Sequence, residues 1–188
     1  MVFIAVVAAL TGCAFSDRPQ YHGLSLDPPL ENDGFELISA DGPVSADDFA
    51  GQYVALFFGY TNCPDVCPAT LSVLRRALSQ LDPDMAERVR VAFVSVDPER
   101  DTPARLVEYT SAFDDSFVGL TGTDEQISRV ASSFGIYYGR AEGSDASDYL
   151  VDHTASVLLL DPNGDTRMMW SYGTDAEQIA EDLRNLLR

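Results

Sequence analysis

The stretch that decides the fold reads Gly59-Tyr60-Thr61-Asn62-Cys63-Pro64-Asp65-Val66-Cys67-Pro68, and it directly follows an apolar run from Val54 to Phe58. A short apolar run that ends at a glycine is typical of a buried strand, and leucines recur on one helical face after Pro68. The two thiols are therefore predicted to lie where a strand gives way to a helix. A helix N-terminus carries free N–H groups and a partial positive charge, which favour a thiolate. The stretch thus predicts a redox site, a copper site or both.

The spacing of the two cysteines fits poorly with two familiar thiol chemistries. Three residues separate Cys63 from Cys67, which makes a wider loop than the Cys-x-x-Cys of a thioredoxin-type site. A peroxidatic cysteine needs a threonine or serine three positions before it, and Tyr60 occupies that position. A purely structural disulfide is the remaining alternative, but it would close a very small loop and stabilise little. We interpret such a bridge as one redox state of the site.

Taken whole, the stretch from Gly59 to Pro68 resembles the signature of the Sco/SenC family, and the resemblance extends from Tyr21 to the C-terminus. The run from Ser95 to Pro103 is similar to a second motif of that family. The family comprises thioredoxin-fold copper proteins that help assemble the binuclear copper site of cytochrome c oxidase. The resemblance implies this fold here, and it implies a copper ligand at His153.

The expected metal ligands are Cys63, Cys67 and His153. Two thiolates and an imidazole suit Cu(I), and with an added water or carboxylate they can hold Cu(II). The same set with an open fourth position also suits zinc, although the affinity order favours copper.

Three acidic residues are candidates for tuning this site from outside the ligand set. Asp65 lies between the cysteines, where its charge opposes the thiolates and helps to retain a cation. Asp97 and Asp101 follow a predicted strand at its C-terminal end, where the sites of α/β proteins gather. For Asp97 and Asp101 the alternative role is helix capping or loop structure.

Beyond the cysteines, strand and helix patterns alternate along the chain, which predicts an α/β, thioredoxin-like fold. We expect an N-terminal hairpin, a family insertion around Gly139 to Asp148 just before the histidine loop, and helices capped by Asp101 or Thr102, by Thr123 and by Thr174. The expected strands are 35–38, 53–58, 90–96, 118–120, 156–160 and 167–171, and the expected helices are 68–81, 103–113, 124–134 and 175–187.

The N-terminus predicts an exported protein. Residues 1–12 contain an apolar run that is too short to span a bilayer but suits a signal peptide, and they end just before Cys13. The sequence Leu10-Thr11-Gly12-Cys13 resembles a bacterial lipobox, which implies lipidation at Cys13 after cleavage. The alternatives are a plain cleaved signal or a truncated transmembrane anchor, and each of them also exports the domain. Residues 13–33 are polar and proline-bearing, as expected of a tether, and residues 34–188 form the domain. These features predict a lipoprotein of the bacterial cell envelope that faces the periplasm.

The charge of the chain limits its partners. The 188 residues carry a formal net charge of −18, with twelve basic residues that are all arginine. So negative a surface argues against nucleic acid and anionic lipid surfaces as partners. The excess charge suits either steering toward a cationic protein or simple solubility, and we expect a monomer anchored through its lipid.

Two functions remain open at this level, and they use the same two thiols. The first is a metallochaperone that delivers copper to the binuclear site of cytochrome c oxidase subunit II, which needs no turnover chemistry. The second is a thiol-disulfide reductase that reduces the cysteines of that site before another protein loads them. Only the chaperone requires His153. A copper or redox sensor is a third, weaker hypothesis.

Overall fold

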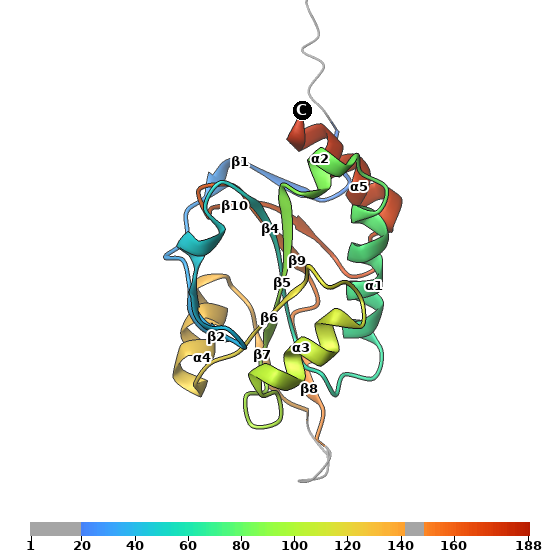
Figure 1. Ribbon diagram of the computed structural model, residues 1–188. Coiled ribbons are helices and arrows are strands. Elements are labelled where there is room, and N and C mark those ends of the chain that lie inside the picture. The colour runs from blue at the N-terminus through green and yellow to red at the C-terminus, as the bar shows by residue number, and fades with distance from the viewer. Residues whose placement is uncertain (1–19, 142–148) are drawn as a thin grey trace, which may run out of the picture.

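A computed structural model describes residues 20–141 and 149–188. The elements, in chain order, are β1 Leu24–Leu30, β2 Glu36–Ser39, β3 Gly42–Ser45, the 3₁₀ helix η1 Ala46–Phe49, β4 Tyr53–Gly59, α1 Val66–Leu78, α2 Pro83–Ala86, β5 Val89–Ser95, α3 Pro103–Ser111, β6 Val118–Leu120, α4 Asp124–Ser133, β7 Tyr138–Arg140, β8 Val151–His153, β9 Val157–Leu160, β10 Thr166–Trp170 and α5 Ala176–Leu187 (Figure 1).

A six-stranded mixed sheet in the order β1-β10-β9-β4-β5-β6 forms the centre of the molecule. Strand β4 lies inside it, parallel to β5 and antiparallel to β9. Both faces of β4 are covered, since Phe57 packs in one core cluster and Phe58 in the other, and both rings are fully buried. Burial on both faces explains why β4 appears in the sequence as a continuous apolar run.

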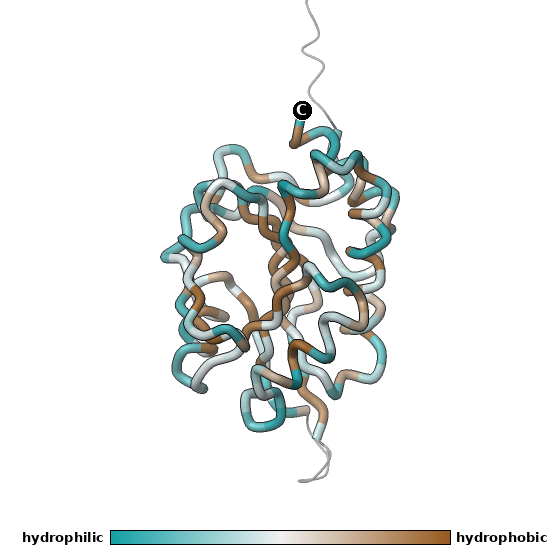
Figure 2. Tube along the Cα trace, viewed as in Figure 1, coloured by the Kyte–Doolittle hydropathy of each residue, from teal (hydrophilic) through white to brown (hydrophobic). Residues whose placement is uncertain are grey.

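Two layers cover the sheet. Helices α1, α3 and α5 pack on one face through residues such as Leu71, Leu106 and Ile179. Helix α4 and the β2–β3 hairpin cover the other face, on the left in Figure 1. Hydrophobic residues follow the central strands and hydrophilic ones the outer loops (Figure 2). The expected α/β class, thioredoxin-like fold and hairpin are confirmed.

Two helices begin at residues other than those predicted, and α1, α3 and α4 end one to three residues earlier. Helix α1 begins at Val66 and not at Pro68, so that Cys67 belongs to its first turn. Proline is tolerated there because the first N–H groups of a helix have no partner within it. Helix α5 is capped by Asp175, which forms a capping box with Gln178, whereas the hydroxyl of Thr174 bonds the carbonyl of Ser171. The predicted cap at Thr174 is therefore wrong by one residue, while the caps Thr102 and Thr123 are confirmed.

The segment expected to be a tether contains the edge strand of the sheet. Strand β1 pairs antiparallel with β10, in a register that places Leu24 opposite Met169. The ordered sheet thus starts ten residues before the predicted domain boundary at residue 34. Pro28 and Pro29 concealed this strand, because prolines are compatible with a strand only at its unpaired edge or at an irregularity.

Several expectations concern residues outside the described ranges. They are the signal peptide, the predicted lipidation of Cys13, and residues 142–148 of the predicted insertion. The first residues of that insertion, Gly139 and Arg140, are described and belong to β7. Within residues 20–141 and 149–188, no helix has the length and apolar character needed to cross a membrane.

Candidate functional site

The cysteine loop, residues 59–68, connects the end of β4 to the first turn of α1. Cys63 is half-buried in the loop and Cys67 is fully buried, and both are free thiols. The backbone N–H of Cys67 points at the sulfur of Cys63 over 3.4 Å, as expected for a thiolate beside a helix N-terminus. The predicted strand-to-helix placement of the two thiols is confirmed.

His153 reaches this loop from a distant part of the chain. It ends β8, which pairs with β7 in a separate two-stranded ribbon, here called the histidine ribbon. Its Nε2 lies 3.4 Å from the sulfur of Cys67, and its Nδ1 lies 3.2 Å from the carbonyl oxygen of Thr154. When Nδ1–H donates to that carbonyl, the lone pair of Nε2 is directed at the sulfurs and is available for a metal.

Aromatic rings enclose the imidazole. The ring of Phe57 lies 6.0 Å and that of Tyr60 6.1 Å from the ring of His153, both in edge-on arrangements. Tyr60 is buried and hydrogen bonds the backbone of Val151 in the histidine ribbon. The residue that argues against a peroxidase in the sequence thus forms a wall of the site.

The ligand atoms of Cys63, Cys67 and His153 all lie within 4.8 Å of one another. Among the described residues, this is the one group of three or more histidine, cysteine and acidic side chains close enough to share a metal ion. Two soft sulfurs and an imidazole fit Cu(I), and the same set can also hold zinc. The two thiols could alternatively form a disulfide, so the geometry supports both metal binding and thiol chemistry.

The two thiols differ strongly in acidity. The hydrogen bond from the Cys67 thiol lowers the pKa of Cys63 to about 3, against the opposing effect of burial and with help from His153 and backbone N–H groups. The pKa of Cys67 is raised, because its proton bonds the Cys63 sulfur and because it is buried. The first proton therefore leaves Cys63, which is the more exposed of the two sulfurs.

A glycine makes room for the buried sulfur. A Cβ atom added at Gly59 would lie 2.6 Å from the sulfur of Cys67 and 2.8 Å from the ring of Phe93. Such distances are too short for non-bonded atoms, so no larger residue fits without moving Cys67 or Phe93.

The three acidic residues lie outside the group of ligand atoms. Asp101 is buried and accepts hydrogen bonds from the backbone N–H of Thr61 at 2.9 Å, the hydroxyl of Thr61 at 2.5 Å and the hydroxyl of Ser95 at 2.6 Å. Asp97 is also buried and accepts from Arg100 and Tyr149. Asp65 is exposed at the start of α1 and makes no capping bond. Asp97 and Asp101 thus brace the loops around the site, and Thr102 caps α3.

One residue that holds the cysteine loop escaped sequence analysis. Arg105 of α3 donates to the hydroxyl of Thr61 at 2.6 Å and to the side-chain oxygen of Asn62 at 2.5 Å. Its spacing of four from Asp101 is an ordinary helical ion-pair pattern, so nothing in the sequence connects it to the cysteines.

Comparison with known proteins agrees with this architecture. The family model described as SCO1/SenC matches residues 25–188. The mitochondrial SCO2 homologue of Bos taurus is 40% identical over 152 residues, which cover 80% of this chain and 57% of the bovine protein. The chain therefore spans little more than half of that relative.

Solved structures are similar over most of the chain. Apo Sco1 from Thermus thermophilus is 40% identical with a TM-score of 0.81, over 89% of this chain and 97% of that one. ScoI from Arabidopsis thaliana, solved with copper bound, is 34% identical with a TM-score of 0.75, over 82% and 97%. With a family match over residues 25–188, a shared fold and the expected cysteine and histidine side chains brought together, this chain belongs to the SCO1/SenC family.

Proposed function

We propose that this protein is an exported metallochaperone that binds copper through Cys63, Cys67 and His153 and delivers it to the binuclear copper site of cytochrome c oxidase subunit II. The observation that carries the proposal is the convergence of two sulfurs and one imidazole nitrogen within 4.8 Å, from segments 86 residues apart. A thiol reductase needs the sulfurs alone, whereas a copper site also uses the imidazole.

The chemistry of the donors supports copper as the cargo. Soft thiolates favour Cu(I), which accepts three ligands. Cys63 is poised as a thiolate and His153 has its Nε2 directed at the sulfurs, so only the proton of Cys67 must leave when the ion binds. A solved relative that is 34% identical holds copper.

Unequal exposure of the ligands suggests the order of transfer. Cys63 and His153 are half-buried, whereas Cys67 is fully buried. An acceptor thiolate can therefore approach Cu(I) from the Cys63 side. It displaces Cys63 and His153 first, and the bond between copper and Cys67 breaks last. Each step exchanges one ligand for another, and the oxidation state of copper does not change.

The place of action follows from the N-terminal sequence. Export through the signal peptide and a lipid on Cys13 would tether the domain to the bacterial envelope, on the periplasmic side, where the copper domain of an oxidase is exposed. Mass spectrometry of the protein from the membrane fraction tests this, because lipidation adds a diacylglycerol mass to a chain that begins at Cys13.

The half-exposed Cys63 thiolate also favours the second candidate, a reductase of the acceptor's cysteines. Mixing the Cu(I)-loaded protein with the reduced, metal-free copper domain of subunit II separates the two. The chaperone predicts that copper appears on the acceptor, and that His153→Ala carries less copper into the transfer. Reduction of an oxidised acceptor at the same rate with and without His153, combined with no copper transfer, would establish the reductase instead.

A further inference from the structure

Both halves of the copper site are attached to one short loop. Residues 96–102, the β5–α3 loop, contain Asp101, which accepts two hydrogen bonds from Thr61 of the cysteine loop. The same loop contains Asp97, which accepts a hydrogen bond of 2.5 Å from the phenol of Tyr149, four residues before His153. The hydroxyl of Ser95 joins the two carboxylate positions, since it donates to Asp101 and accepts from the N–H of Asp97.

The histidine ribbon depends on such attachments for its position. Its strands are three residues long and form no ladder with the six-stranded sheet. Two-stranded ribbons of this size are not stable by themselves in water. The location of the His153 ring is therefore set by the contacts that the ribbon makes with the rest of the domain.

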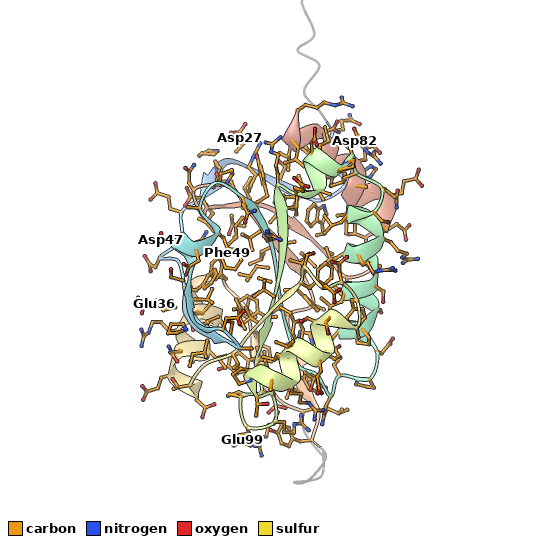
Figure 3. The ribbon with its side chains drawn as sticks, viewed as in Figure 1. Asp27, Glu36, Asp47, Phe49, Asp82 and Glu99 are labelled. Carbon is orange, nitrogen blue, oxygen red and sulfur yellow. The ribbon has the colours of Figure 1, made fainter. Side chains whose placement is uncertain are left out.

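Tyr149, two residues before β8, makes several of these contacts. Its side chain is buried, and the guanidinium carbons of Arg100 and Arg140 lie 3.7 and 3.9 Å from the centre of its ring. Its hydroxyl also lies 3.3 Å from Glu99, which in turn pairs with Arg140 of β7. Glu99 lies at the end of the molecule where the ribbon is found (Figure 3). One aromatic ring thus joins both strands of the ribbon to the β5–α3 loop.

We propose that Tyr149 is a positioning residue for copper binding, whose hydrogen bond to Asp97 keeps the His153 ring close enough to the sulfurs of the cysteine loop for all three groups to share one metal ion. This inference rests on the proposed copper site and adds a residue that touches neither ligand nor metal. Because the β5–α3 loop holds Thr61 and Tyr149 together, it sets the separation between imidazole and thiols.

The variant Tyr149→Phe tests the proposal, because it removes the hydroxyl and keeps the ring between the two arginines. Loss of a direct hydrogen-bond partner of a metal ligand typically weakens metal binding 10–100-fold. Tyr149 acts one contact further from the ligand, so we expect an effect at the low end of this range, about a tenfold rise in the dissociation constant for Cu(I). In the background of His153→Ala, the same change should cause no further loss, since the residue it positions is gone. The control is Tyr172→Phe on the exposed β10–α5 loop, which should leave the affinity unchanged.

A measurement on the metal-free protein tests whether Tyr149 positions His153, independently of whether the proposed copper site is correct. The chain contains two histidines, so the ring signals of His153 in an NMR spectrum are assigned by comparison with a His22→Gln variant. In the reduced, metal-free protein, the contacts of His153 with Phe57 and Tyr60 should weaken in Tyr149→Phe. Unchanged ring contacts, or an equal loss of copper affinity with and without His153, would overturn the proposal. Copper binding that is indifferent to His153 would refute the proposed copper site, and the ring contacts would still decide the role of Tyr149.

Discussion

At the scale of single residues, the two thiols differ in acidity and in exposure. Cys67 is enclosed by the core and keeps its proton, while Cys63 faces solvent in part and is ionised. The difference gives the site one reactive and one protected ligand.

This asymmetry predicts the alkylation pattern of the reduced protein. With the pKa of Cys63 lowered to about 3, its thiolate is fully formed above pH 5 and is lost only as the pH falls through the pKa. Iodoacetamide should therefore modify Cys63 alone at pH 5, at a rate that stays nearly constant to pH 8, as followed by mass spectrometry. An ordinary thiol, with a pKa near 8.5, would react about tenfold faster per pH unit over most of this range.

The matched control for that experiment is Cys67→Ala, which removes the proton donor that is the largest cause of the lowered pKa of Cys63. The rate at Cys63 should then regain a dependence on pH. A rate that rises with pH in the unaltered protein, or modification of Cys67 first, would show that Cys63 is not the ionised thiol.

Gly59 leaves the space that the sulfur of Cys67 occupies. The variant Gly59→Ala places a Cβ 2.6 Å from the sulfur of Cys67, so we expect a loss of about 1–3 kcal/mol in the free energy of unfolding, as for other overpacked cores. Urea denaturation measures it, and copper affinity should fall as well. In Gly139→Ala the new Cβ meets only the exposed end of Tyr137, and the same measurements should change little. Equal changes in unfolding free energy and copper affinity in the two variants would show that the sulfur of Cys67 does not need the space beside Gly59.

The sequence identified the reactive residues and the two buried aspartates beside them, and it missed two other residues that support the site. Cys63, Cys67 and His153 were predictable because few residue types offer soft ligands, and because the family motif includes them. Arg105 and Tyr149 were not, since arginine and tyrosine occur in many roles and these acquire theirs only when separate loops meet.

At the scale of elements, the sequence predicted the buried strands and the longer helices, whose apolar periodicity is strong. The edge strand β1 escaped because it is half-exposed and contains two prolines, so its pairing with β10 is a property of the tertiary fold.

The start of β1 is held by a buried carboxylate in α5. Asp182 accepts hydrogen bonds from the N–H groups of His22 and Gly23, both at 2.9 Å, and from the indole of Trp170 at 2.8 Å. Asp182→Ala should lower the free energy of unfolding by about 3 kcal/mol, because it leaves these donors without an acceptor. Chemical denaturation measures the loss. Asp182→Asn keeps one acceptor oxygen and should lose less, so equal losses in both variants would contradict this explanation.

At the scale of the whole molecule, acidic residues far outnumber basic ones, 30 against 12. The net charge is −18, and three ion pairs between arginine and carboxylate offset part of the repulsion among the residues that the structure describes. Repulsion among the acidic groups therefore opposes folding, and salt screens it.

The molecule should accordingly be stabilised by salt. We expect the midpoint of thermal unfolding to rise between about 0.02 M and about 0.5 M sodium chloride, over which the screening length falls several-fold. Calorimetry at several salt concentrations measures this midpoint. A second monovalent salt without chloride shows whether screening or specific chloride binding causes the rise. A midpoint that falls with salt would mean that the ion pairs outweigh the repulsion.

X-ray absorption at the copper edge of the protein loaded with one equivalent of Cu(I) identifies directly the atoms that bind the metal. We expect two sulfur ligands and one nitrogen ligand in the unaltered protein, and two sulfurs without that nitrogen in His153→Ala. Identical spectra from the two proteins would contradict this expectation, because the imidazole would then lie outside the site that these three residues are proposed to form.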